Sequence, residues 1–485
     1  MRHVKTRLMV VVMLATFATF AASPAARQAD YPRPTGTQTE NGLAGFAKIL
    51  CSAVFVSGRD PAEAAKNSAY FFMPRDQQDK VTFTIDRDRK TARATFGQTS
   101  REARLYGDQG CIIERPDGIH FTPVPVRTTL PDAASQPWPM GDKDAGGPLP
   151  PNVDKSKLDA ALDAAFADPN GLTAAFLVLY KGRIVAERYA PGITKDTQLE
   201  SWSMGKSITS TLFSLLVKDG TYRLDQPAPV PLWHQAADDP RARIRNIDLL
   251  QMSGGLKFVG NQEPGGSPQD TVLDHYFIYT GATDAFNFSI TRPLEFPPGT
   301  DGRYRNCDPL TIGYLIKLAV QKRGEEYLTW PQKMLFDRIG IRRQVLETDP
   351  YGNFLMTGYD YGTARNWARI GLLYAQDGMW QGQRILPEGW TTFVSTPAPA
   401  WKRPVYGGLF WVNGDGGWNL PKDTYLAAGA GGQNTWIVPG RDLVIVRMGH
   451  MRGQTAARRI TNQALGLVTQ ATAVRPPVGS TLPAR

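Results

Sequence analysis

Two side chains near the middle of the chain have the types and spacing that nucleophilic catalysis needs. Ser203 and Lys206 stand three residues apart in SWSMGKSITSTLF, where the apolar residues recur with helical spacing. Residues at i and i+3 of a helix share a face, so the lysine amine can approach the serine hydroxyl. A serine hydroxyl is a weak nucleophile until a base takes its proton. The amine can be that base if burial or a neighbouring cation lowers its pKa.

The surrounding residues favour such a lowered pKa. Trp202, Met204 and Ile208 are apolar and would help to bury the amine. The N-terminus of a helix also points N–H groups at the serine, which stabilises developing negative charge. A Ser-x-x-Lys pair arises by chance in a chain of this length, so catalysis requires further elements.

A second element lies about 100 residues farther along, in FPPGTDGRYRN. Here Tyr304 and Asn306 form a Tyr-x-Asn pattern after a Pro-Gly-Thr turn. A phenol beside an ammonium group can transfer protons, and the asparagine amide can bond both the lysine and a substrate carbonyl. Tyr351-Gly352-Asn353 has the same pattern but lacks this lead-in and lies farther from the serine, so we prefer Tyr304.

The third element is the small-residue stretch in TYLAAGAGGQNTWIV. Small residues at the edge of a strand let the backbone approach a bound substrate closely. One N–H group from this stretch, beside that of Ser203, would complete an oxyanion hole. Tight packing without any catalytic role remains an alternative explanation for these glycines.

In this order, the three elements resemble the serine beta-lactamase-related family across residues from about 153 to 472. The family includes class C beta-lactamases, D-Ala-D-Ala carboxypeptidases, family VIII esterases and 6-aminohexanoate-dimer hydrolases. The stretches IRNIDLLQMSGGLKF and TARNWARIGLLYAQDGMWQGQRILPEGW also resemble family segments. The resemblance implies an α+β fold of the beta-lactamase/transpeptidase type, with an antiparallel sheet flanked by helices and a mostly helical subdomain.

The resemblance also implies roles for individual residues. Ser203 would be the acylated nucleophile and Lys206 its activating partner. Tyr304 would act as general base toward the serine and then as acid toward the leaving group. Asn306 would position the substrate and the lysine. The N–H groups of Ser203 and Ala430 would form the oxyanion hole.

The third element departs from the penicillin-recognising members. Those proteins carry Lys-Thr-Gly or His-x-Gly, whereas this chain has Ala427-Ala428-Gly429. The missing cation removes an anchor for a substrate carboxylate, which favours neutral esters or amides. Gly429 to Gln433 most resembles the 6-aminohexanoate-dimer hydrolase branch, with Gly429 and Gly431 expected to border the substrate.

We therefore expect a serine hydrolase that cleaves a small-molecule ester or amide through an acyl-enzyme, without metal or organic cofactor. A beta-lactamase or D-Ala-D-Ala carboxypeptidase is the alternative in the same class, and a non-catalytic binding protein is the alternative outside it. An α/β-hydrolase would need a late histidine, for which only His450 is available. The remaining histidines outside the N-terminal segment, His120, His234 and His275, lack metal-ligand spacing and are expected on the surface or in the core.

The helices and strands that must position these residues come after an N-terminal segment of a different character. Residues 1–25 combine basic residues, an apolar run and small residues, which is typical of a cleaved signal peptide. We therefore expect a periplasmic or secreted protein with no stable membrane span after cleavage. The formal net charge is +10, but no dense cluster of lysine and arginine supports nucleic-acid binding.

Two folded regions are expected after this segment. Residues 26–150 should form an α+β region and a linker, with helices at 43–56 and after Asp60, a hairpin around 87–90, and strands near Cys111 and at 119–126. Cys51 and Cys111 are candidates for a disulfide, with two separate thiols as the alternative, and Cys307 is expected to be a buried filler. Residues 151–472 should carry strands at both ends, including one at 406–413, with helices between, and 473–485 should be a disordered tail.

Overall fold

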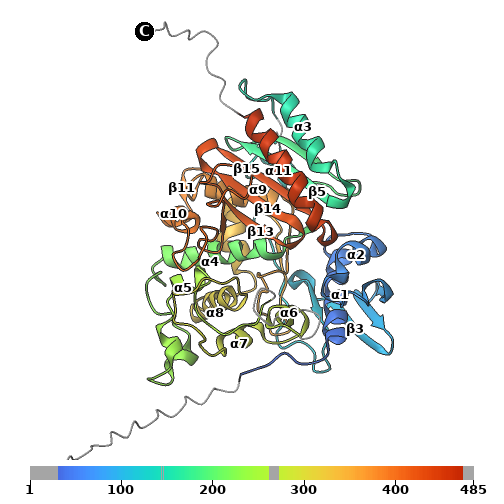
Figure 1. The fold of residues 1–485 in the computed structure, drawn as a ribbon, viewed down its shortest axis with the longest axis vertical. Coiled ribbons are helices and arrows are strands. Elements are labelled where there is room, and N and C mark those ends of the chain that lie inside the picture. The colour runs from blue at the N-terminus through green and yellow to red at the C-terminus, as the bar shows by residue number, and fades with distance from the viewer. Residues whose placement is uncertain (1–30, 144, 146, 261–271, 473–485) are drawn as a thin grey trace, which may run out of the picture.

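The described part of the chain is built from helices and antiparallel sheets, which confirms the expected α+β class (Figure 1). The computed structural model describes residues 31–143, 145, 147–260 and 272–472. The expected signal peptide and C-terminal tail lie outside these ranges. Within them, no helix has the length and apolar character needed to cross a bilayer.

An N-terminal region of two helices and a small sheet precedes the larger part of the chain (Figure 1). Its first helix begins earlier than expected because Thr37 and Glu40 form a capping box. Asp60 caps the second helix as expected, and its carboxylate accepts the Glu63 N–H at 2.9 Å. The first helix packs on a sheet of order β1-β2-β3-β4. The elements are α1 (Gln38–Phe55), α2 (Pro61–Asn67), the 3-10 turn η1 (Ala69–Phe72), β1 (Thr82–Asp86), β2 (Thr91–Phe96), β3 (Thr99–Leu105) and β4 (Cys111–Ile113).

The strand predictions for this region are partly confirmed. The hairpin forms as expected, with Asp86 opposite Thr91. The strand predicted at 119–126 is wrong, because these residues join no sheet. Pro123 and Pro125 lack the N–H groups that a hydrogen-bonded ladder requires.

The central sheet joins two segments that lie far apart in the sequence. Its order is β12-β13-β14-β15-β5-β6, and neighbouring strands are antiparallel. The two segments meet where Tyr180 of β5 pairs with Leu443 of β15, as the strands at both ends of the region predicted. The strand predicted at 406–413 is reduced to two residues. The strands are β5 (Thr173–Tyr180), β6 (Arg183–Tyr189), β12 (Trp411–Val412), β13 (Tyr425–Gly429), β14 (Gln433–Val438) and β15 (Leu443–Gly449).

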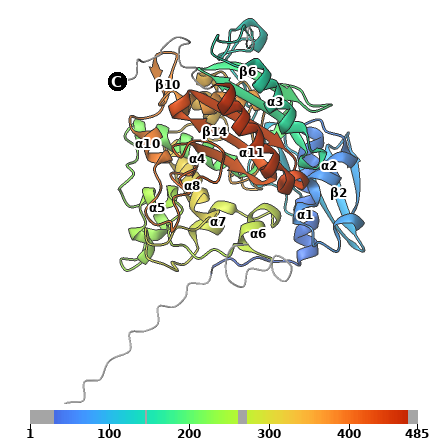
Figure 2. The same cartoon turned by 45° about the horizontal axis from the view of Figure 1, so that its top comes forward.

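Helices cover both faces of this sheet. Phe176 and Val178 of β5 pack in the core formed with α3 and α11, whereas Leu177 and Leu179 belong to the core on the opposite face. This alternation follows from the two-residue period of a strand. Figure 2 shows α3 and α11 side by side over the sheet, and α9 packs against its other face. The helices are α3 (Lys155–Phe166), α9 (Ala364–Ala375) and α11 (Gln454–Ala471).

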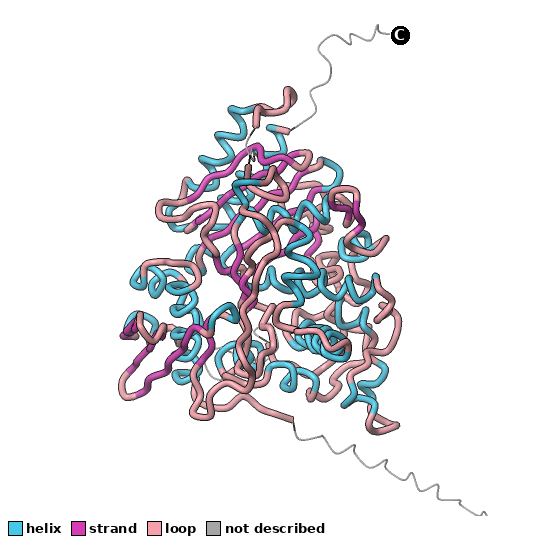
Figure 3. The backbone as a smooth tube through the Cα atoms, turned by 180° about the vertical axis from the view of Figure 1, so that it is seen from behind, coloured by secondary structure: helices cyan, strands magenta, loops and turns pink. Residues whose placement is uncertain are grey.

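Most of the segment between β6 and β12 forms a mostly helical part beside the sheet, whereas α9 of the same segment packs on the sheet itself (Figure 1). Seen from behind, the strands gather in the central sheet and separately in the N-terminal region (Figure 3). In the helical part, α4, which follows Ser203, packs on α8, which follows Tyr304. Its elements are β7 (Leu199–Glu200), the 3-10 turn η6 (Trp202–Met204), α4 (Gly205–Lys218), α5 (Asn246–Leu250), α6 (Asp274–Thr280), α7 (Ala285–Ile290), α8 (Cys307–Lys322), β8 (Val345–Leu346), β9 (Asp360–Gly362), β10 (Met379–Trp380), β11 (Gln383–Arg384) and α10 (Trp390–Ser395).

Candidate active site

Ser203 lies on the turn η6, immediately before α4. The preceding Trp202 has a left-handed backbone with φ of 50°, which a residue other than glycine adopts only at a cost. Gly205 opens α4 at a point of close contact, because a Cβ there would lie 2.3 Å from the Met356 carbonyl oxygen. These two features place Ser203 in a tightly packed bend.

Lys206 meets the serine as the i, i+3 spacing predicts. Its Nζ lies 2.9 Å from Ser203 Oγ and 2.7 Å from the Thr357 carbonyl oxygen, which accepts an N–H. The lysine is 1% exposed, and burial lowers its pKa well below the usual value. A neutral amine can donate to Thr357 and still offer its lone pair to the serine hydroxyl.

Tyr304 reaches the same point from a distant part of the chain. The centroid of its ring lies 4.8 Å from Lys206 Nζ. Burial raises the pKa of the phenol, and a hydrogen bond with Ser203 opposes that rise only in part. The phenol therefore keeps its proton at neutral pH. The alternative Tyr351 stacks on His120 and is not among the residues lining the cavity around Ser203.

Asn306 forms no hydrogen bond with Lys206 among the described residues. Its Nδ2 donates to Tyr279 Oη at 3.2 Å and lies 3.3 Å from His275 Nε2. The residue is fully buried and is not among those lining the cavity around Ser203. In this arrangement the Asn306 amide contacts Tyr279 and His275, and a role in positioning substrate and lysine stays a prediction.

His275 is a site residue that the sequence does not reveal. It lines the same cavity as Ser203, and its ring centroid lies 6.3 Å from that of Tyr304. Burial, followed by the charge of Lys206, lowers the pKa of His275 to about 3, so the imidazole is neutral. Its Nδ1 has no hydrogen-bond partner among the described residues. The late His450 instead lies 3.4 Å from a carboxylate oxygen of Glu200.

Asp360 of β9 is a second group that the sequence does not reveal. Burial raises its pKa to about 8, although a hydrogen bond with Ser201 and the charge of Lys206 act in the opposite direction. The carboxyl is therefore largely protonated at neutral pH. It does not supply the full negative charge that would hold the nearby lysine in its protonated form.

The backbone at the end of β13 lies close to Ser203. A Cβ on Gly429 would lie 3.0 Å from the Ser203 nitrogen and 2.2 Å from the Ser201 carbonyl oxygen, so only glycine fits. Gly429 and Ala430 both line the cavity around Ser203. The Gly431 N–H is directed elsewhere, because it donates to Gln454 Oε1 at 2.9 Å.

Ser203, His275, Tyr304, Gly429 and Ala430 border a cavity of about 920 Å³, which we call the main cavity. Its lining includes the aromatic residues Phe71, Trp202, Tyr276, Tyr304 and Trp411. It also includes the polar residues Asn434, Gln454 and Thr455. Such a cavity can hold a small molecule with an apolar part and a hydrogen-bonding part.

The cavity rim carries two exposed arginines. Arg403 is paired with Asp415, and Arg458 lies over the Trp418 ring while donating to the Gly417 carbonyl at 3.0 Å. No group of three or more metal-ligating side chains occurs within the part of the chain that the structure describes.

The three cysteines form one disulfide and one free thiol, as expected from the sequence. Cys51 and Cys111 form a disulfide that links α1 to β4. Cys307 is a free, buried thiol. Burial raises the pKa of this thiol well above its usual value, which makes it unreactive and fits a filler role.

Comparisons with known proteins show which family and fold this chain resembles. The beta-lactamase family profile matches residues 158–470. The chain is 24% identical over 298 residues to a 6-aminohexanoate-dimer hydrolase of Paenarthrobacter ureafaciens, covering 57% of this chain and 72% of that protein.

Solved structures show a similar fold. A Bacillus anthracis protein assigned by inference as a 6-aminohexanoate-dimer hydrolase superposes with a TM-score of 0.52 and 18% identity, covering 74% of this chain and 89% of that one. EstCE1, a hydrolase with promiscuous acyltransferase activity, superposes with a TM-score of 0.50 and 14% identity, covering 64% of this chain and 98% of that one.

Proposed function

Because this chain belongs to the beta-lactamase family and is a serine hydrolase, we propose that it cleaves a neutral ester or amide through an acyl-enzyme on Ser203. The observation that carries the proposal is that Lys206 Nζ lies 2.9 Å from Ser203 Oγ and 4.8 Å from the centroid of the Tyr304 ring, while Ser203 and Tyr304 line the main cavity. The similarity to a 6-aminohexanoate-dimer hydrolase supports an amide among the possible substrates.

In the first step, neutral Lys206 accepts the Ser203 proton as Oγ attacks the substrate carbonyl. Its lowered pKa and its 2.9 Å distance from Oγ support this role. We propose the lysine, rather than Tyr304, as the first base because burial keeps the phenol protonated. The N–H groups of Ser203 and Ala430 stabilise the oxyanion.

In the second step, Tyr304 donates its proton to the leaving oxygen or nitrogen as the carbonyl–leaving-group bond breaks. The phenolate formed beside the protonated amine then takes a proton from it, which restores both groups. Water then attacks the acyl carbonyl and gives one proton to neutral Lys206, while the bond from the acyl carbon to Ser203 Oγ breaks and Oγ takes a proton from Tyr304. The protonated amine returns a proton to the phenolate, which restores all three groups. The sequence of transfers balances without any cofactor.

The neutral character of the substrate follows from the third motif. Ala427 and Ala428 carry no charge at the position where penicillin-recognising members hold a cation. Arg403 and Arg458 are exposed at the rim, and both already have partners. A beta-lactamase or D-Ala-D-Ala carboxypeptidase activity is therefore the second candidate in the same class.

A fluorophosphonate probe tests the nucleophile. Labelling of the wild type that disappears in Ser203→Ala and persists in Ser156→Ala, an exposed serine, supports catalysis. If Ser203→Ala is labelled like the wild type, the assignment is wrong. No labelling in either protein favours a binding protein on the same fold.

Substrate class is tested with 4-nitrophenyl acetate, 6-aminohexanoate dimer and a chromogenic cephalosporin. We expect turnover of the ester or the linear amide and little turnover of the lactam. Rapid cephalosporin hydrolysis would contradict the proposed preference for neutral substrates.

We also propose that the protein is exported to the periplasm or the medium. The Cys51–Cys111 disulfide supports an oxidising compartment, where such bonds persist. N-terminal sequencing of the protein from cell fractions checks this. Cytoplasmic protein with residue 1 intact would contradict it.

A further inference from the structure

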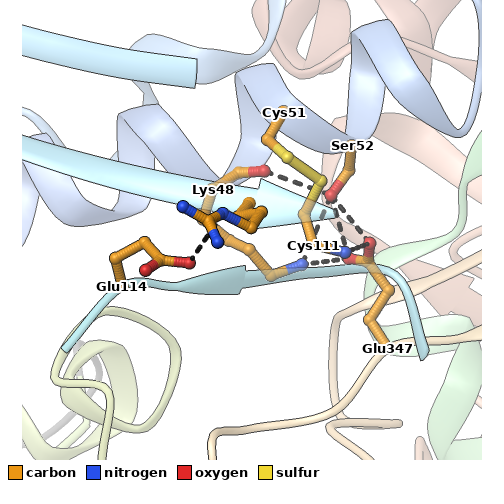
Figure 4. The surroundings of a disulfide bond; sticks show 7 residues. Lys48, Cys51, Ser52, Cys111, Glu114 and Glu347 are labelled. Atoms are coloured by element: carbon orange, nitrogen blue, oxygen red, sulfur yellow. Dashed lines mark hydrogen bonds and ion pairs between the residues drawn. A yellow bond between two sulfur atoms is a disulfide. The ribbon is translucent and has the colours of Figure 1, made fainter. Parts of the chain in front are cut away.

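The N-terminal region precedes the segment matched to the beta-lactamase family and is fastened to it by buried contacts. Lys48 of α1 forms a buried ion pair with Glu347, beside the Cys51–Cys111 disulfide (Figure 4). Glu347 also accepts from Ser52 Oγ and from the Cys111 N–H, each at 2.8 Å. Removing one partner would leave a buried charge unpaired, so separating the two regions at this contact is energetically costly.

A second anchor lies three residues before the nucleophile. Arg59 donates to Glu200 Oε2 at 2.9 Å, and Ser68 Oγ donates to Glu200 Oε1 at 2.6 Å. Burial alone would raise the pKa of Glu200, but the charge of Arg59 overrides it and lowers the pKa to about 2. The pair therefore stays ionised and fixes the N-terminal region against the strand that leads to Ser203.

The same region supplies a wall of the main cavity. Phe71, on η1, lines this cavity together with Trp202 and Tyr276. Its ring centroid lies 5.2 Å from that of Trp202 and 5.9 Å from that of Tyr276, edge-on to both. Since Trp202 immediately precedes Ser203, an N-terminal side chain stands beside the nucleophile.

A second cavity of about 260 Å³ adjoins the same rings. Phe71 and Tyr276 line both cavities, whereas α1 contributes Asn41 and Gly42 to the second one. The Phe71 ring is therefore part of the partition between the two spaces. Its removal would join them and enlarge the room beside Trp202.

We propose that the N-terminal region completes the active site and that Phe71 limits the size of the substrate group that lies beside Trp202. This inference rests on the proposed function, since it assigns a size limit to the site around Ser203. It predicts that the wild type prefers substrates with a compact group at this position. A variant without the ring should accept a bulkier group that extends into the second cavity.

The test compares substrates that differ in size on either side of the scissile bond. The 4-nitrophenyl esters of acetic and phenylacetic acid vary the acyl group, and ethyl and benzyl acetate vary the alcohol. For each series we compare kcat/KM for the bulky substrate with kcat/KM for the small one. In Phe71→Ala we expect this ratio to rise about tenfold in either the acyl series or the alcohol series. Phe71→Leu should give a smaller rise, and Phe71→Trp a fall.

Phe83→Ala is the matched control, because Phe83 also belongs to the N-terminal region and packs on Phe46 but lines neither cavity. Its ratios should equal those of the wild type. Unchanged or lowered ratios in Phe71→Ala would overturn the inference while leaving the hydrolase function intact. If Phe71→Ala fails to fold, the ratios for Phe71→Leu and Phe71→Trp decide. If Ser203 reacts with neither esters nor fluorophosphonates, both proposals fall.

Discussion

The pH dependence of acylation should identify Lys206 as the group that accepts the Ser203 proton. A base works only when it is unprotonated, so kcat/KM should rise with pH through the pKa of Lys206 in the free enzyme. Burial lowers that pKa, so the plateau should be reached well below pH 10.5. Burial raises the pKa of Tyr304 above 10, so no decline should appear before pH 10.

The size of the effect follows from the 2.9 Å contact between Lys206 Nζ and Ser203 Oγ. A base at hydrogen-bond distance contributes about 10²- to 10⁴-fold to the rate, or about 3–5 kcal/mol. Lys206→Ala should lose that factor on the plateau and should lose the acidic limb. Tyr304→Phe should lower kcat/KM as well but keep the limb, because it removes the acid and not the base.

The assay measures kcat/KM for a 4-nitrophenyl ester between pH 5 and 10, read at a wavelength where nitrophenol and its anion absorb equally. Asp360→Asn is the necessary control, since Asp360 also titrates in this range with a pKa of about 8. The reasoning is refuted if the rate still climbs at pH 10. It is also refuted if the acidic limb survives in Lys206→Ala and vanishes in Tyr304→Phe.

Three further predictions concern stability. The pKa of Asp360 is about 8 in the folded state and 3.8 for the free group. Its contribution to stability is therefore fully present below pH 3.8 and is lost as the pH rises through 8. We therefore expect the free energy of unfolding of Asp360→Asn, measured in urea relative to that of the wild type, to be larger at pH 9 than at pH 5. The same difference between variant and wild type at both pH values would contradict this. Lys48→Met should destabilise by about 3–5 kcal/mol by stranding Glu347, and Lys48→Met with Glu347→Leu should recover much of the loss; no recovery would mean that packing, not charge, is at stake. Replacing Cys51 and Cys111 by alanine should cost about 4 kcal/mol for a 60-residue separation, and an unchanged unfolding midpoint would show that the bond adds nothing.

The parts of the site that share a local pattern were predictable from the sequence. Ser203 and Lys206 meet because one helical turn separates them, and Tyr304 is marked by its lead-in. His275 has no such pattern, because its neighbours Asn306 and Tyr304 reach it only after α6 and α8 have packed near each other. A residue whose partners are distant in the sequence has no neighbours at a fixed spacing, so no motif in the sequence marks it.

The same distinction holds for the fold. The strands around residues 180 and 443 were predictable because their apolar runs and turns are local features. The early start of α1 had a local signal in Thr37 and Glu40, which the apolar pattern alone missed. The burial of Lys48 had none, since a lysine in an amphipathic helix ordinarily faces solvent, and Glu347 lies far along the chain.

The pairing of β5 with β15 also determines when, during synthesis, the enzyme can mature. The eight residues of β5 are all buried in the finished protein, yet they are translated long before the strand that covers their edge. Until then the nascent chain exposes an apolar strand whose backbone N–H and C=O groups are unpaired along one edge, which favours aggregation. Holdase chaperones should therefore bind around residues 173–180, and a ribosome stalled before residue 443 should carry Ser203, Lys206 and Tyr304 but show no activity.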